Sequence, residues 1–140
     1  MVIYIKYCNL IQKSVIIGNG GLISAKEVKL LDINKEIIDV QDALKRIGGS
    51  MDLYKRLLNQ FSGGDHIDPL EEALSTGALD EASRLIHTLK GVAANLSLIK
   101  LSAKAKELEE KIKNGLDHSD TFAELKHAYY ETSQQIVEIS

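Results

Sequence analysis

The stretch from Leu79 to Leu96 constrains the fold more than any other part of this chain, because its apolar residues recur at helical spacing. Apolar residues at positions i, i+3, i+4 and i+7 lie on one side of an α-helix. The apolar positions of this stretch are Ala82, Leu85, Ile86, Leu89, Val92, Ala93 and Leu96. The stretch therefore predicts one helix whose continuous apolar face is buried in a core.

His87 lies off this apolar face, about 100° around the helix from Ile86, and we expect its side chain to be exposed. Lys90 follows one turn later with a positive charge, and Gly91 clears space, although glycine inside a helix costs about 1 kcal/mol relative to alanine. An accessible imidazole beside an ammonium could receive and pass on a phosphoryl group, because that transfer depends mainly on positioning and charge neutralisation. A lone histidine on a polar helix face is more often a plain surface residue, so spacing alone leaves both interpretations open.

The sequence from His87 to Leu96, HTLKGVAANL, resembles the signature of histidine-containing phosphotransfer (HPt) domains. That signature is a histidine, any residue, leucine, lysine and glycine, followed by small residues and an apolar one. The similarity covers residues 38–115 and is to the HPt domains attached to bacterial hybrid sensor kinases. Ser97 stands where the family usually has glycine, and we expect its side chain to cap the following helix.

The resemblance implies that His87 accepts a phosphoryl group from the aspartyl phosphate of a response-regulator receiver domain and hands it to another receiver. It also implies that Lys90 neutralises charge. The partners it implies are receiver domains and a hybrid histidine kinase, and the receiver would bring Mg²⁺, so we expect no cofactor in this chain itself. The residues expected to dock the partner are Ser83, Arg84, Gly91, Ala94 and Asn95.

Helical periodicity continues on both sides of this stretch, with glycines or capping residues between the periodic segments. Short connections between amphipathic helices make neighbours antiparallel, so we expect an all-α, up-and-down antiparallel four-helix bundle with an extra N-terminal helix. The expected members are residues 50–76, 79–96, 98–114 and 119–138, with 34–47 packed across one end. The first member contains a Ser-Gly-Gly-Asp break at residues 62–65, so it is either two helices or one kinked helix.

Residues 1–31 form a separate N-terminal appendage or linker in this interpretation, and residues 32–140 form the HPt-like bundle. The first seventeen residues are strand-like and could form a small hairpin, pack on the bundle or fray. A glycine-rich break follows at residues 18–21, and Ser24 to Glu27 has the spacing of a capping box that could start a short helix.

Composition excludes several classes of function. Seventeen Lys and Arg residues against twenty Asp and Glu residues give a net charge of −3, which argues against nucleic-acid binding. No apolar run approaches the roughly 20 residues of a membrane span, and the N-terminus lacks a clean signal-peptide core. A single cysteine, Cys8, excludes an intramolecular disulfide and fits a reducing compartment. We therefore expect a cytoplasmic protein without membrane insertion, and a monomer.

The remaining motifs of the sequence favour other functions less strongly. Glu124 and His127 have the Glu-x-x-His spacing of di-iron bundles, but a second copy is missing, so a surface pair is favoured over a metal-binding bundle. His66, His118 and Cys8 lack metal-ligand spacing. No nucleotide-binding glycine loop is present, so we expect no autonomous kinase activity. The remaining alternative is a non-phosphorylated helical adaptor that binds a partner through the His87 face.

Overall fold

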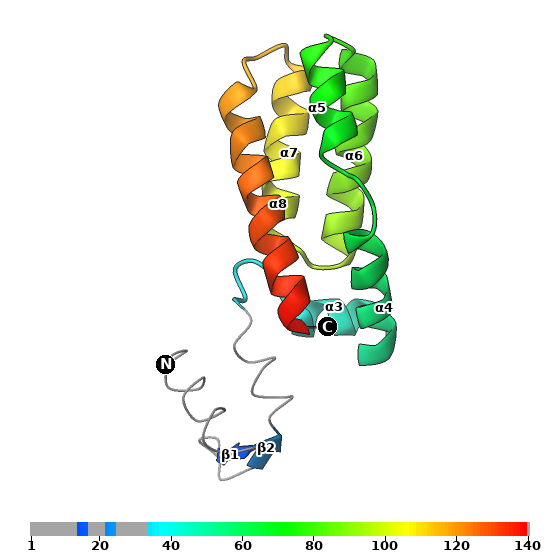
Figure 1. Ribbon diagram of the computed structural model, residues 1–140, viewed down its shortest axis with the longest axis vertical. Helices are drawn as coiled ribbons and strands as arrows, with labels where there is room; N and C mark the ends of the chain where they lie inside the picture. Colours follow the sequence, from blue (N-terminus) through cyan, green and yellow to red (C-terminus); the bar gives the residue numbers. More distant parts are fainter. Residues whose placement is uncertain (1–13, 17–21, 25–33, 140) are drawn as a thin grey trace.

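The computed structural model describes residues 14–16, 22–24 and 34–139, and from residue 34 onward their regular structure is helical (Figure 1). The helices are α3 (Val40–Arg46), α4 (Met51–Ser62), α5 (Asp68–Ser75), α6 (Leu79–Asn95), α7 (Ile99–Lys113) and α8 (Ser119–Ile139). The expectation of a helical domain is confirmed.

A short hairpin precedes the helices. Strand β1 (Ser14–Ile16) pairs antiparallel with β2 (Leu22–Ser24), with Val15 opposite Ile23. Ser24, the expected N-cap of a short helix, is the last residue of β2, and the helix expected to follow it lies outside the described residues. Most of the strand-like N-terminus and the domain boundary near residue 31 also lie outside them, so the division into two parts stays a prediction.

Helix α6 has a packing neighbour before it and another after it in the chain. It packs against α5 and α7, α7 packs against α8, and α4 packs against α8 and α3. Figure 1 shows α6, α7 and α8 side by side in alternating directions, joined by short loops, with α3 across the end that carries the C-terminus. The predicted rotation of α6 is confirmed, because Ala82, Ile86, Leu89 and Ala93 are buried.

The segment 50–76 consists of two helices, α4 and α5, separated by the predicted break. Ser50 caps α4 by accepting a hydrogen bond from the backbone N–H of Leu53 at 3.2 Å. Asp68 is the first residue of α5, and its N–H donates to the Asp65 carboxylate at 3.1 Å. A turn stabilised by the Asp65 side chain therefore separates α4 from α5.

The turn between α6 and α7 is centred on Ser97, which adopts a left-handed backbone conformation with φ of 54°. The N–H of Ser97 donates to Ala94 O at 3.2 Å and that of Leu98 to Ala93 O at 2.9 Å, the two bonds of a Schellman motif. The capping prediction for Ser97 is wrong, because Leu98 is the N-cap residue of α7. The Ser97 hydroxyl donates instead to the Asp42 carboxylate at 2.7 Å and ties α3 to this turn.

Candidate functional site

The exposed face of α6 carries His87, whose side chain is 72% exposed. The burial of Ile86 and Leu89 fixes the rotation of the helix and directs the intervening imidazole outward. Gly91 lies on the same exposed side, and a Cβ built on it meets no atom within 4 Å. The local sequence therefore presents a histidine next to open space, as the helical pattern predicted.

Glu109 of α7 joins His87 to Lys90. One carboxylate oxygen lies 2.7 Å from His87 Nδ1, and the other pairs with the Lys90 ammonium. The Glu109 side chain is only 20% exposed, because it lies in the seam between α6 and α7. The three side chains form a continuous trio on two adjacent helices.

The contact with Glu109 determines which nitrogen of the His87 ring keeps its lone pair available. The Lys90 ammonium, and to a lesser degree His87, lower the pKa of Glu109, although partial burial acts in the opposite direction. Glu109 is therefore a carboxylate at neutral pH, and a carboxylate only accepts hydrogen bonds. His87 Nδ1 must carry the hydrogen and donate it, which in the neutral ring leaves the lone pair on Nε2.

Glu109 was not among the predicted site residues. Its spacing from Lys113 is that of an i,i+4 pair within α7, but the Glu109 side chain reaches His87 and Lys90 of α6 instead. The sequence nevertheless contains a signal for this contact. His87 lies ten residues before the turn at Ser97, and Glu109 lies twelve residues after that turn. Two antiparallel helices with a rise of about 1.5 Å per residue bring such positions level with each other.

The residues predicted to dock a partner all belong to α6. Arg84, Gly91 and Ala94 are exposed around His87, and Arg84 Nε donates to Glu81 at 2.9 Å. Ser83 is half-buried on the same helix. Asn95 lies farther along α6 and lines a groove on the side of α4.

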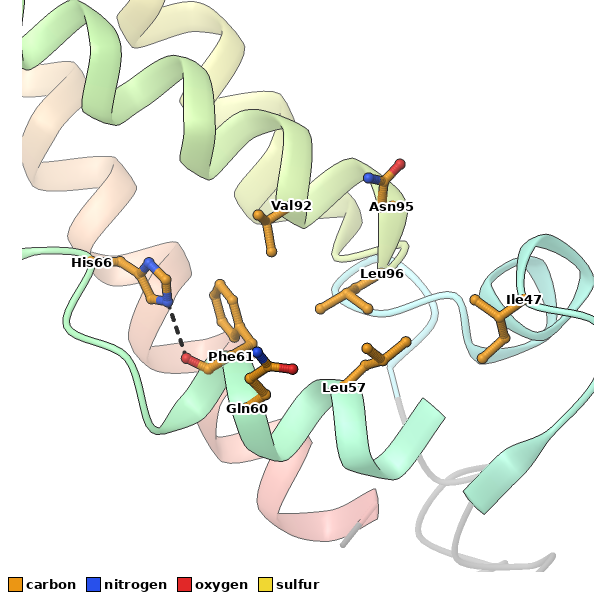
Figure 2. Close-up of a pocket in the computed structure, with 8 residues that line it drawn as sticks. All are labelled: Ile47, Leu57, Gln60, Phe61, His66, Val92, Asn95 and Leu96. Atoms are coloured by element: carbon orange, nitrogen blue, oxygen red, sulfur yellow. Dashed lines mark hydrogen bonds between the residues drawn. The ribbon is translucent and has the colours of Figure 1, made fainter. Parts of the chain in front are cut away.

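This groove has a volume of about 490 Å³ (Figure 2). The His66 ring stacks on Phe61, with ring centres 4.6 Å apart, and His66 Nε2 donates to Phe61 O at 3.0 Å. The lining residues come from α4, from α6, from the C-caps of α3 and α6, and from the loop after α4: Ile47, Leu57, Gln60, Phe61, His66, Val92, Asn95 and Leu96. None of them is an aspartate, glutamate, lysine or arginine.

Both side chains of the candidate di-iron motif contact other side chains. Glu124 pairs with Lys104, and His127 Nε2 lies 2.7 Å from Glu131. Over residues 34–139 and the two strands, no group of three or more His, Cys, Asp or Glu side chains is arranged to hold a metal ion. Among the described helices, none has the length and apolar character needed to cross a membrane.

Comparison with known families agrees with this geometry. The family model of the Hpt domain matches residues 58–135, more than half of the chain. Searches of curated proteins and of solved structures found no significant match. The matched range contains all three members of the trio, His87, Lys90 and Glu109. The chain therefore belongs to the Hpt domain family.

Proposed function

We propose that this protein is the phosphocarrier of a two-component phosphorelay, which accepts a phosphoryl group on His87 from a receiver aspartyl phosphate and passes it to another receiver. The observation that carries the proposal is the 2.7 Å contact between His87 Nδ1 and Glu109. This contact directs the nucleophilic lone pair to Nε2 of a highly exposed ring.

In the proposed step, His87 Nε2 attacks the phosphorus of the aspartyl phosphate. A nitrogen–phosphorus bond forms while the bond from phosphorus to the aspartyl oxygen breaks, and the receiver keeps the electron pair as a carboxylate. The proton on Nδ1 stays between the ring and Glu109, whose charge stabilises the positive ring that results. Transfer to a second receiver reverses the same bonds.

Lys90 has two parts in this proposal. In the unphosphorylated protein its ammonium pairs with Glu109, which keeps that carboxylate ionised and directed at the ring. It also lies one turn from the acceptor, where a cation can neutralise charge on the phosphoryl group. The receiver supplies Mg²⁺, and this chain needs no cofactor of its own.

We further infer that α4 and α5 together, with α6, α7 and α8, form an up-and-down antiparallel four-helix bundle, with α3 packed across one end. The packing of α6 against α5 and α7, and of α7 against α8, supports this arrangement. The open space at Gly91 supports close approach of a receiver over His87. We propose that the domain acts as a cytoplasmic monomer.

The test uses a small phosphodonor and a protein phosphodonor side by side. Wild-type protein is incubated with phosphoramidate, and separately with a panel of phosphorylated receiver domains. We expect phosphate that is acid-labile and alkali-stable, located on His87 by mass spectrometry. His87→Gln should abolish it, while His127→Gln should not.

His127 is a matched control because its side chain is also 72% exposed and also contacts a glutamate. Equal labelling of the wild type and His87→Gln would contradict the site assignment. A folded wild-type protein that takes phosphate from neither donor would favour the helical adaptor.

A further inference from the structure

Arg84 lies one turn before His87 on the exposed face of α6, and Glu81 holds it there. Arg84 Nε and Nη2 donate to the two oxygens of the Glu81 carboxylate at 2.9 and 2.5 Å. Residues three positions apart are neighbours on a helix surface, with about 5–6 Å between their Cβ atoms, so the guanidinium can also reach the His87 ring. The side chains of Arg84 and Glu81 are 65% and 49% exposed, so the guanidinium can exchange partners without any change in the core.

Phosphorylation of His87 would leave the trio with a net negative charge. While the ring is neutral, the charges of the Lys90 ammonium and the Glu109 carboxylate cancel. A phosphoryl group brings roughly two negative charges, and a phosphorylated ring that keeps its Nδ1 hydrogen is positive. About one negative charge of the phosphorylated trio is therefore uncompensated.

Arg84 is better suited than Lys90 to compensate this charge. These two are the arginine and lysine residues of α6, and each is three positions from His87. Lys90 already pairs with Glu109, and a full turn of its ammonium toward the phosphoryl group would take away the largest influence that keeps the Glu109 pKa low. Arg84 leaves behind only the exposed Glu81, whose carboxylate water can solvate. A guanidinium also binds phosphate through two parallel N–H···O bonds, whereas an ammonium acts as a point charge.

We propose that Arg84 leaves Glu81 when His87 is phosphorylated and binds the phosphoryl group on Nε2 through its guanidinium. The inference rests on the proposed function and names the residue that retains the phosphoryl group on this chain. Arg84 was expected to dock a partner protein, whereas its ligand in this proposal is the phosphoryl group carried by its own helix. Glu81 competes for the same guanidinium and so weakens this retention.

The experiment measures how phosphate is distributed at equilibrium between this protein and a receiver that is active with the wild type. Arg84→Gln should shift the equilibrium toward the phosphorylated receiver by about three- to fivefold, because the phosphorylated protein loses a charge-assisted contact. Arg56→Gln is the matched control, since Arg56 is an exposed arginine of α4, and it should leave the equilibrium unchanged. A purely docking role for Arg84 would change the KM for the receiver but not the equilibrium constant between the free proteins.

Glu81→Gln should have the opposite effect, because it frees Arg84 from its competing partner. We expect a shift of about twofold toward phosphorylated His87, and no shift when the same substitution is made in Arg84→Gln. An equal effect of Glu81→Gln with and without Arg84 would mean that Glu81 does not act through the guanidinium, which would overturn the exchange of partners.

The isolated protein provides a second measurement without any receiver. After phosphorylation by phosphoramidate, ³¹P NMR titration should show a higher pKa of the phosphoryl group in Arg84→Gln than in the wild type, because the guanidinium favours the dianion. An unchanged transfer equilibrium together with an unchanged ³¹P titration would overturn the proposal. Circular dichroism should show an intact helical fold in every variant. Failure of the wild type to accept phosphate from phosphoramidate would instead count against His87 as acceptor, so the two failures are distinguishable.

Discussion

At the scale of single residues, the site depends on one carboxylate that serves two partners. Glu109 accepts from His87 Nδ1 through one oxygen and binds Lys90 through the other. Neutralising Glu109 would remove the fixed negative charge that orients the ring and stabilises it after phosphorylation. The histidine alone, without this support, has two possible tautomers and no preferred acceptor nitrogen.

Glu109→Gln should therefore slow phosphorylation of His87 by about ten- to a hundredfold with both phosphoramidate and a receiver. The effect should fall on the rate constant at saturation more than on the receiver KM, since Glu109 acts on the ring and not on docking. Glu110→Gln is the matched control, because Glu110 is exposed on the same helix. A wild-type rate in Glu109→Gln would show that the ring needs no carboxylate partner.

The same residue predicts an acid dependence of stability. The pKa of Glu109 is lowered from its ordinary value of 4.5, first by Lys90 and then by His87. A group with a lowered folded-state pKa stabilises the fold above its unfolded pKa, and this contribution is lost as the pH falls through the folded value. The free energy of unfolding of Glu109→Gln should be lower than that of the wild type by on the order of 1 kcal/mol at neutral pH. Urea titrations should show that this difference becomes smaller below pH 4.5. A difference that grows on acidification would contradict this assignment.

Leu89 is the opposite case on the same helix, because its side chain is only 2% exposed. Leu89→Ala should cost about 2–5 kcal/mol of unfolding free energy, since the core cannot fully collapse around the cavity. Below the melting temperature the variant should still accept phosphate from phosphoramidate. Unchanged denaturant stability would mean that the rotation of α6, and with it the exposure of His87, is wrong.

At the scale of elements, the sequence predicted the helices well and the turns less well. Apolar periodicity located α6, α7 and α8, because burial of one helix face leaves a repeating pattern in the chain. The turns depend on contacts with distant residues. Ser97 was expected to cap α7, but its hydroxyl bonds to Asp42, fifty-five positions away, and no local pattern encodes that partner.

The contacts and backbone conformation of Ser97 predict an order of stability for the wild type, Ser97→Ala and Ser97→Gly. Ser97→Ala keeps the left-handed conformation and loses the 2.7 Å bond to Asp42, so it should cost about 1 kcal/mol of unfolding free energy. Ser97→Gly loses the same bond, but relieves a backbone penalty of about 1–2 kcal/mol and should be more stable than the alanine variant. Chemical denaturation of the three proteins measures the order. An alanine variant more stable than the glycine variant would mean that the backbone at this turn is not left-handed in solution.

At the scale of the whole molecule, the sequence located the exposed histidine of α6 but not the surface around it. His87 and Lys90 lie on one helix, so helical spacing placed them correctly beside each other. The contact with Glu109 needs the register between α6 and α7, and the groove needs α3, α4 and α6 in place together. Such features depend on tertiary packing, which a one-dimensional pattern records only indirectly.

Gly91 tests how the whole surface works, because it lies one turn from His87 and its missing side chain leaves open space. Gly91→Leu should keep or raise stability, since leucine is a better helix former by somewhat less than 1 kcal/mol. Its side chain would nevertheless project into the surface that a receiver must approach. A displacement of about 1 Å between reacting atoms can reduce the rate about a hundredfold, so transfer from a receiver should fall on that scale.

The comparison that isolates this effect is between donors. Phosphoramidate is small enough to reach Nε2 past the added side chain, so its reaction with Gly91→Leu should remain within a few-fold of the wild type. Ala103→Leu, at an exposed position on α7, controls for an added apolar side chain elsewhere on the surface. Melting temperature, receiver transfer rate and phosphoramidate rate are measured on the same preparation. Normal receiver transfer in Gly91→Leu would show that the receiver does not cover this turn of α6, and would remove the steric reason for a glycine beside His87.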